Sequence, residues 1–248
     1  MAVTFKGLGN EGRLGNQMFQ YAFVRGVAAN RGFDWMIPGP NADRLDNYGL
    51  FDAFELTNCD LNKNTGEPFY KTVEYRDMHF NEEIYDRCED NTNFSGNFQT
   101  ERYFETITES IREDFTFKKA YLEPCQEFID SLGGRDQCIF LHVRRGNPNL
   151  TGRRGEKWSY QMVQEYHPLC KDDYYVRALQ EFPEDKTVIV VSDVIDWCKK
   201  QPYLQGDRFQ FSDSSYEVFG DGASVPYVDL CLMSLCGGAI IANSSLSW

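Results

Sequence analysis

Three places in the second half of the chain put polar or charged side chains where an apolar, strand-like run ends. Arg144 ends one run, Asp193 follows another, and the pair Ser244-Ser245 follows a third. Ligands of open parallel sheets bind just beyond the carboxyl ends of the strands, so we expect these side chains to converge on one crevice. A guanidinium offers two directed donors and a fixed charge, which suits a phosphate better than a lysine would. The spacing therefore predicts an anion site in this half.

A second group of donors lies near the N-terminus, where a glycine-rich turn precedes a predicted helix. Residues 12–22 read Gly-Arg-Leu-Gly-Asn-Gln-Met-Phe-Gln-Tyr-Ala. Free backbone N–H groups at a helix N-terminus, together with the positive end of the helix dipole, favour an anion. The side chains of Arg13, Asn16 and Gln17 add donors beside Gly15. We expect a phosphate or a sugar to bind there.

Few residues are candidates for proton transfer. His142, two residues before Arg144, admits three interpretations: a contact to a nucleotide, a general base, or a histidine satisfied within the core. Glu156 and Glu165 lie in or just beyond the loop after Arg144, and such loops often bring a base within reach of an acceptor hydroxyl. A solvated surface charge is the commoner role for either glutamate, so the sequence leaves the general base open.

Composition and charge argue against several classes of protein. The chain has 248 residues and a net charge of -13, which disfavours a general nucleic-acid binder because phosphate neutralisation needs a basic face. Its eight cysteines form no Cys-x-x-Cys pair, so the spacing of a cysteine metal site is absent. No DxD-like metal motif has a suitable context either, and we expect no metal and no cofactor. No signal peptide is recognised, and no apolar run approaches the roughly 20 residues of a membrane span. We expect a soluble, cytoplasmic protein, and the oligomeric state stays open.

The second half alternates strand-like and helix-like segments. Strands are expected at 138–144, 186–192, 208–212 and 239–243, and helices at 172–182, 196–200 and 227–236. Such alternation predicts a parallel sheet with right-handed crossovers.

The first half has a less regular pattern. It opens with a strand at 3–8 and a helix that ends near residue 30, continues through a loop-rich stretch at 38–71, and shows helical patterning at 100–115 and 120–132. The pair Gly133-Gly134 breaks the last helix. We therefore place a domain boundary there, which gives two Rossmann-like domains, 1–132 and 133–248, of ordinary domain size.

Four segments of the chain resemble, in order, the motifs of the alpha-1,2-fucosyltransferases, glycosyltransferase family 11. They are Gly-Arg-Leu-Gly-Asn-Gln-Met-Phe-Gln-Tyr-Ala at 12–22, Leu-His-Val-Arg-Arg-Gly-Asn at 141–147, Val-Ser-Asp-Val-Ile-Asp-Trp at 191–197 and Ile-Ala-Asn-Ser-Ser-Leu-Ser-Trp at 241–248. Weaker agreement at 96–104 and 173–175 extends the resemblance over nearly the whole chain.

The resemblance implies a fold and an activity. The fold is α/β and GT-B-like, with two Rossmann-like domains whose parallel sheets face each other across a cleft. Residues 1–132 would form the acceptor side, and 133–248 would bind the nucleotide-sugar donor. The activity is inverting transfer of L-fucose from GDP-fucose to a sugar hydroxyl, the 2-hydroxyl of galactose or a similar sugar, without a metal. GDP-fucose and a galactose-containing glycan are then the expected partners.

The resemblance also assigns roles to single residues. Arg144 matches the arginine that contacts the donor diphosphate, and it is the predicted catalytic residue. The predicted donor-binding residues are His142, Arg144, Arg145, Asp193, Ser244 and Ser245. Among them, Asp193 is expected to accept hydrogen bonds from the N1–H and exocyclic amine of guanine, because a carboxylate is the natural bidentate partner of these two donors.

Three departures from the family pattern keep alternatives open. Asn147 and Val194 stand where the family has aspartates, and the chain ends at Trp248, where the resembled proteins continue into a further helix. A GDP-sugar-binding protein with impaired catalysis is therefore one alternative. A more remote alternative is an NAD-dependent oxidoreductase, because residues 7–12 satisfy Gly-x-Gly-x-x-Gly, with Asp34 about twenty residues further on.

Overall fold

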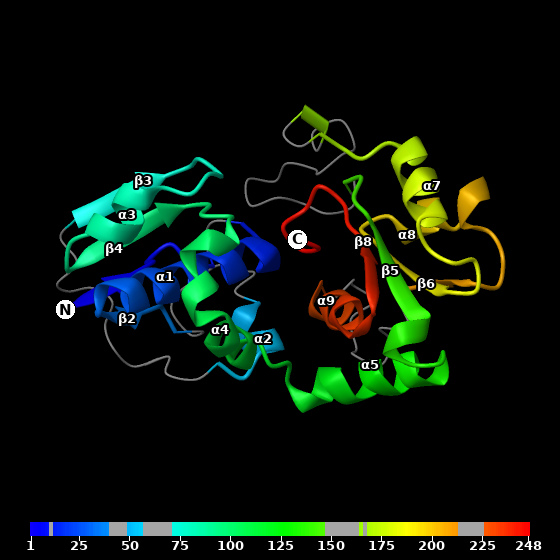
Figure 1. Cartoon of the computed structure of the whole chain (residues 1–248), viewed down its shortest axis with the longest axis horizontal. Coiled ribbons are helices and arrows are strands. Elements are labelled where there is room, and N and C mark those ends of the chain that lie inside the picture. Colours follow the sequence, from blue (N-terminus) through cyan, green and yellow to red (C-terminus); the bar gives the residue numbers. More distant parts are fainter. Residues whose placement is uncertain (10–11, 40–48, 57–70, 147–163, 166–167, 213–225) are drawn as a thin grey trace. The chain divides into compact units, whose positions relative to one another are not determined.

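The computed structural model describes residues 1–9, 12–39, 49–56, 71–146, 164–165, 168–212 and 226–248. The chain divides into two compact units, Met1–Lys118 and Lys119–Trp248, and each contains one four-stranded sheet (Figure 1). Every pairing between the named strands is parallel. The predicted α/β class is confirmed, whereas the facing of the two sheets across a cleft stays a prediction.

The first unit has the strand order β2-β1-β4-β3. Its elements are β1 (Ala2–Thr4), α1 (Leu14–Arg31), β2 (Asp34–Met36), α2 (Leu50–Ala53), β3 (Lys71–Tyr75), α3 (Glu82–Arg87), β4 (Thr92–Gly96), the 3₁₀ helices η1 (Glu101–Tyr103) and η2 (Glu105–Ile107), and α4 (Thr108–Asp114).

Helix α1 supplies much of the core of this unit. Its Phe23 stacks on Phe98, with the ring centroids 3.7 Å apart, and meets Tyr103 edge-on at 4.8 Å. Phe80 packs on the same Tyr103 ring, also at 4.8 Å. Aromatic rings bury large apolar areas, so this cluster fixes α1 against β4 and η1.

The second unit has the strand order β7-β6-β5-β8. Its elements are α5 (Lys119–Ser131), η3 (Arg135–Gln137), β5 (Cys138–Val143), α7 (Asp172–Gln180), β6 (Thr187–Ser192), α8 (Ile195–Cys198), η4 (Pro202–Leu204), β7 (Phe209–Phe211), α9 (Pro226–Leu235) and β8 (Gly238–Ile240).

Helices cover both faces of the second sheet (Figure 1). On one face, Tyr175 and Leu179 of α7 and Cys198 of α8 join alternate residues of β5 and β6 in one buried cluster. On the other face, α9 packs against β5 and β6, with α5 against α9. Every residue of β5 is buried, as expected for a central parallel strand. The carboxyl ends of β5 and β6 therefore extend from the buried core of the unit.

The boundary between the units lies before α5, and not at Gly133-Gly134 as predicted from the sequence. Helix α5 groups with the second unit because it packs on α9. The Tyr121 and Tyr227 rings lie 5.0 Å apart, and the Cys231 thiol donates to the Tyr121 carbonyl at 3.9 Å. The glycine pair ends α5 without separating the domains. The acceptor and donor roles of the two units stay predictions.

Two further expectations for the first unit were wrong in extent. The strand expected at 3–8 ends at Thr4, because the chain turns there, with the Leu8 N–H donating to the Phe5 carbonyl at 3.0 Å. The helical patterning at 100–115 corresponds to η1, η2 and the short α4 and not to one helix. The interruption lies at Phe104, where the backbone leaves helical geometry (φ -136°, ψ 12°).

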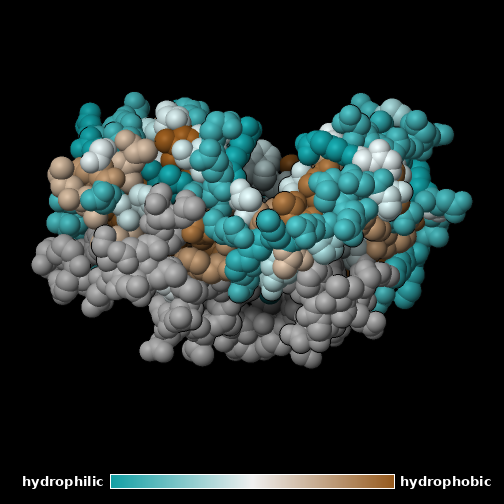
Figure 2. Space-filling view, turned by 90° about the horizontal axis from the view of Figure 1, so that it is seen from below, coloured by the Kyte–Doolittle hydropathy of each residue, from teal (hydrophilic) through white to brown (hydrophobic). Residues whose placement is uncertain are grey.

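Hydrophilic residues cover most of the described surface in the face shown in Figure 2. The large hydrophobic side chains exposed within the described residues are Met1, Met78, Phe128 and Trp248. In the described part of the chain, no helix combines the length and the apolarity needed to cross a membrane.

Candidate functional site

The register of the second sheet sets Arg144 beside Asp193. Strands β5 and β6 run parallel, and their register ends with Val143 opposite Ser192. Arg144 and Asp193 are the next residues along the two strands, so both reach the carboxyl edge of the sheet at neighbouring positions. This edge is where open α/β sheets bind ligands.

Three donors converge on the carboxylate of Asp193. Arg144 Nη1 lies 2.6 Å from Oδ2, the Arg145 backbone N–H donates to Oδ1 at 3.0 Å, and the Gly146 N–H donates to Oδ2 at 2.8 Å. The Asp193 side chain is only 9% exposed and the Arg144 side chain 20%. Hydrogen bonds to an ionised group are stronger than neutral ones, so this cluster holds the turn after β5 firmly. The structure thus brings together three of the predicted donor-binding residues.

Local sequence explains why the two turns meet. Gly146 has φ +87°, a left-handed conformation that glycine adopts without the steric cost of a Cβ atom. On the β6 side, the Ser192 hydroxyl accepts a hydrogen bond from the Val194 N–H at 3.0 Å. Serine bonds of this kind stabilise tight turns. They direct the Asp193 carboxylate toward the β5 turn.

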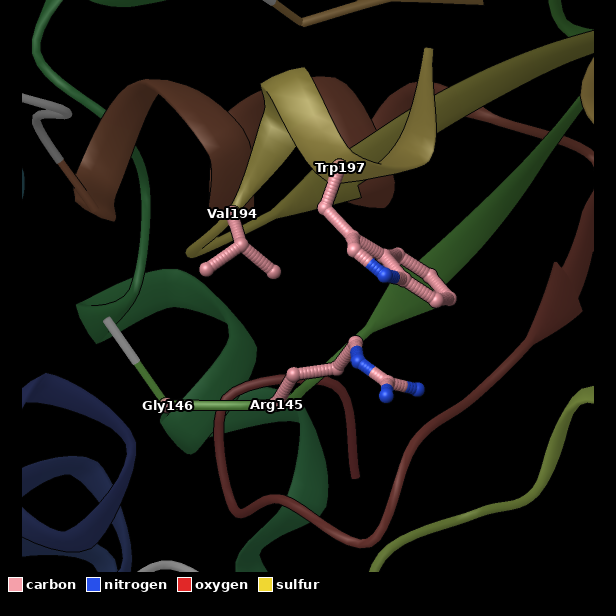
Figure 3. A pocket seen from close by; sticks show the side chains of 4 residues that line it. All are labelled: Arg145, Gly146, Val194 and Trp197. Atoms are coloured by element: carbon pink, nitrogen blue, oxygen red, sulfur yellow. The ribbon is translucent and has the colours of Figure 1, made fainter. Parts of the chain in front are cut away.

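Arg145 is fixed separately from Arg144. Its guanidinium lies 3.8 Å from the centroid of the Trp197 ring and 3.5 Å from Asp172, the first residue of α7. Arg145, Gly146, Val194 and Trp197 line a pocket of about 190 Å³. In Figure 3 the Arg145 guanidinium lies opposite the Trp197 ring, while Val194 forms the neighbouring wall. One wall of the pocket is therefore apolar and the other cationic.

His142 lies beneath this edge, on β5. It is 3% exposed, and its Nδ1 atom has no hydrogen-bond partner within the described residues. Burial and the nearby Arg144 charge lower the pKa of His142 to about 3. The imidazole is therefore neutral at neutral pH.

Ser244 and Ser245 follow β8, the strand on the other side of β5. Leu141 of β5 pairs with Ile240 of β8, so the serine pair comes after the same carboxyl edge as Arg144. The Ser244 hydroxyl accepts from the Leu246 N–H at 3.4 Å in a compact turn. A phosphate contact by either serine stays a prediction.

The glycine turn of the first unit is held by side-chain amides. Gln17 is fully buried; its Oε1 accepts from the Gly49 N–H at 3.1 Å, and its Nε2 donates to the Gly12 carbonyl at 3.4 Å. Asn16 Oδ1 accepts from Gln99 Nε2 at 2.8 Å. Gly12 has φ +82°, and a Cβ there would lie 2.2 Å from Asn16 Nδ2. The turn therefore depends on glycine at position 12 and on the two amides.

The four predicted contact residues of this turn differ in accessibility. Gly15 and Gln17 are buried, whereas Arg13 and Asn16 are partly exposed. Arg13 is the N-cap residue of α1, and no side chain caps the helix there. Arg13 and Asn16 are thus the two whose side chains reach the surface.

Of the remaining predicted positions, the structure describes Glu165. Glu165 is exposed, and Glu156 and Asn147 lie outside the described residues. Within the described ranges, no group of His, Cys, Asp and Glu side chains lies close enough to hold a metal ion. Metal-independent catalysis stays a prediction.

Sequence reasoning overlooked three residues at the two sheet edges. Trp197 is the tryptophan of the Ser-Asp-x-x-x-Trp segment, and its spacing of four from Asp193 was the available signal. Asp172 and Gln99 contact the sites from other elements, and no local pattern in the sequence identifies such partners.

Arg144, Arg145 and His142 give the carboxyl edge of β5 and β6 a defined chemistry. Arg144 is oriented in advance, Arg145 adds a second positive charge, and His142 adds a neutral ring. Preorganised donors of this kind stabilise negative charge without reorganisation when it develops. The arrangement suits an anionic leaving group.

Known proteins with similar sequences are glycosyltransferases. The profile of the family described as Glycosyl transferase family 11 matches residues 7–248. An alpha-1,2-colitosyltransferase of Escherichia coli is 28% identical over 96% of this chain and 83% of its own length. Human galactoside alpha-(1,2)-fucosyltransferase 1 is 24% identical over 93% of this chain and 60% of its own length, so the chain spans well under two thirds of that relative.

Solved structures show the same fold. The fucosyltransferase NodZ from Bradyrhizobium superimposes with a TM-score of 0.61 at 14% identity, over 99% of this chain and 90% of that one. The NodZ alpha-1,6-fucosyltransferase co-crystallized with GDP gives a TM-score of 0.60 at 13% identity. At such identities the likeness establishes the fold alone.

Proposed function

The chain belongs to glycosyl transferase family 11, and from this premise we propose that it transfers L-fucose from GDP-fucose to a sugar hydroxyl with inversion at the anomeric carbon. The acceptor in this proposal is the 2-hydroxyl of galactose or a similar sugar. The observation that carries the proposal is Arg144, a guanidinium held at the carboxyl end of β5 by Asp193 at 2.6 Å.

The donor proposal rests on charge. Breaking the bond between the sugar and the diphosphate leaves GDP with added negative charge, which a directed guanidinium stabilises more in the transition state than in the ground state. We assign this role to Arg144, and the adjacent Arg145 adds a second positive charge. Crystals of the similar NodZ enzyme were grown with GDP or soaked with GDP-fucose, which supports the same nucleotide here.

The acceptor proposal rests on the relatives. Both the colitosyl and the human fucosyl enzymes are named as alpha-1,2 transferases, whereas NodZ is named as an alpha-1,6 transferase. Because the Escherichia coli relative is named as a colitosyltransferase, colitose is an alternative donor sugar. Colitose lacks one hydroxyl of L-fucose. Attack by the acceptor oxygen on the face opposite GDP forms the new bond, and its proton passes to a base or to solvent.

The two alternatives have different support. A GDP-sugar-binding protein with impaired turnover remains the second candidate, because Val194 lines the pocket where the family pattern has an aspartate. The NAD-dependent oxidoreductase has no support. Helix α1 begins at Leu14 and not directly after Gly12, and the matched family is one of glycosyl transferases.

A donor-and-acceptor screen tests the proposal, with released GDP as the readout. GDP-fucose and GDP-colitose serve as donors, and free galactose, lactose and terminal galactosides as acceptors. We expect acceptor-dependent GDP release with GDP-fucose and a product linked at the 2-hydroxyl. Binding of GDP without turnover on any acceptor would favour the binding-protein alternative, and preference for NAD over GDP in a thermal-shift assay would contradict both.

A further inference from the structure

The Asp193 carboxylate has a structural partner on each of its oxygens. We propose that Asp193 is a positioning residue, which fixes Arg144 and the turn after β5 in place and does not recognise the base of the nucleotide. This inference rests on the proposed function for its ligand. It differs from the sequence-based expectation that Asp193 pairs with guanine.

The first argument is the number of acceptor sites. A carboxylate has about four lone-pair positions. Three are taken: Oδ1 by the Arg145 N–H at 3.0 Å, and Oδ2 by Arg144 at 2.6 Å and the Gly146 N–H at 2.8 Å. A bidentate contact with guanine needs one free position on each oxygen, so only an opening of this cluster would allow it.

The second argument is accessibility. The Asp193 side chain is 9% exposed, less than half the exposure of Arg144 at 20%. The guanidinium is therefore the more accessible of the two groups. An arginine has five N–H donors, and among the described residues the Arg144 side chain uses Nη1 for its bond to Asp193. The other donors are oriented in advance.

Both strands contribute to the geometry around the Asp193 carboxylate. The pairing of Val143 with Ser192 brings the two strand ends into line, and the Ser192 hydroxyl tightens the β6 turn through the Val194 N–H at 3.0 Å. Gly146 turns its N–H toward Asp193 with φ +87°. Elements from both strands thus shape the turns around this carboxylate, as expected for a group that supports a binding residue.

The experiment compares GDP, IDP and ADP in calorimetry with the wild type and Asp193→Asn. IDP lacks the exocyclic amine of guanine, so the ratio of GDP to IDP affinity reports base recognition. A positioning residue predicts that Asp193→Asn weakens both nucleotides by the same factor, about tenfold for one charge-assisted contact, with the ratio unchanged. In turnover, kcat falls more than KM rises. A GDP-to-IDP ratio that collapses toward unity in the variant would overturn the inference.

Amide hydrogen exchange provides a second measurement that needs no nucleotide. The Arg145 and Gly146 N–H groups should be protected in the wild type and exchange faster in Asp193→Asn. Asp196→Asn is the matched control, because Asp196 is exposed at the start of α8; it should leave protection and affinity unchanged. Unchanged protection in Asp193→Asn would overturn the inference. A wild type that shows the protection but binds no GDP would instead contradict the proposed function alone.

Discussion

The carboxyl edges of the two sheets are held by different chemistry. In the second unit, ionised side chains hold the edge: Arg144 on Asp193 at 2.6 Å, and Arg145 between Trp197 and Asp172. In the first unit, the neutral amides of the adjacent Asn16 and Gln17 bond across the turn before α1.

The difference indicates what each edge is suited to bind. Fixed guanidinium charges match an anionic diphosphate, whose charge grows as the sugar leaves. Amides match a neutral sugar, which offers hydroxyl donors and acceptors and no charge. Because the chain has a net charge of -13, binding a diphosphate requires a local positive field, and the guanidinium groups of the second unit supply one. Substitutions at the two edges should therefore affect different substrates.

The largest effect is expected from Arg144→Ala. Loss of the guanidinium removes the main stabilisation of the leaving diphosphate, so kcat/KM should fall by about three orders of magnitude. GDP release measures it. Arg177→Ala is the control, because this arginine is 74% exposed on α7 and, within the described ranges, pairs with Asp173 of the same helix. Activity of Arg144→Ala within about threefold of wild type, below 1 kcal/mol, would show that the assigned role is wrong.

In the first unit, Gln17→Ala should affect stability. The substitution leaves the buried Gly49 N–H without its amide partner, which costs about 1–3 kcal/mol of unfolding free energy. Urea unfolding followed by circular dichroism measures it. Gln180→Ala, an exposed amide at the end of α7, is the control. A loss below about 0.5 kcal/mol for Gln17→Ala would mean that the turn does not depend on this amide.

His142 links the charged edge to pH. Its pKa is lowered to about 3 from an unfolded value of about 6.5, so between these values the unfolded chain holds a proton that the folded chain lacks. Protonation of His142 in the unfolded chain therefore lowers the free energy of unfolding as pH falls below about 6.5, by up to about 1.4 kcal/mol per pH unit. The difference in unfolding free energy between wild type and His142→Asn, measured from pH 7.5 to 4.5, isolates this slope. A pH-independent difference would contradict the lowered pKa.

The smallest effect is expected from Asn16→Ala at the neutral edge. Loss of one amide contact should raise KM for the acceptor by about tenfold and leave the affinity for GDP unchanged. Initial rates at varied acceptor concentration measure it, with Asn30→Ala, near the far end of α1, as the control. A rise in the donor KM with no change for the acceptor would assign this edge to the nucleotide instead.

Sequence predicted the second unit better than the first for a physical reason. Strands β5 and β6 are buried almost throughout and consist mainly of apolar and β-branched residues, which makes them recognisable without their neighbours. β3 is mostly exposed and contains Lys71 and Glu74, and β2 has three residues. Their strand structure depends on pairing with β4 and β1, which no local pattern reveals.

The candidate site shows the same limit. The positions of Arg144 and Asp193 at the ends of neighbouring strands followed from sequence, because strand ends are visible in the apolar pattern. Their direct ion pair, and the contact of Arg145 with Trp197, depend on the register of β5 and β6 and on the geometry of two turns. These are three-dimensional properties, and a sequence pattern specifies only the residues that enter them.

A crystal structure of the protein soaked with GDP tests the central claim most directly. We expect the diphosphate oxygens within about 3 Å of the Arg144 guanidinium, with Asp193 still bonded to the turn after β5. A diphosphate bound at another place, with Arg144 contacting only Asp193 and solvent, would contradict the account.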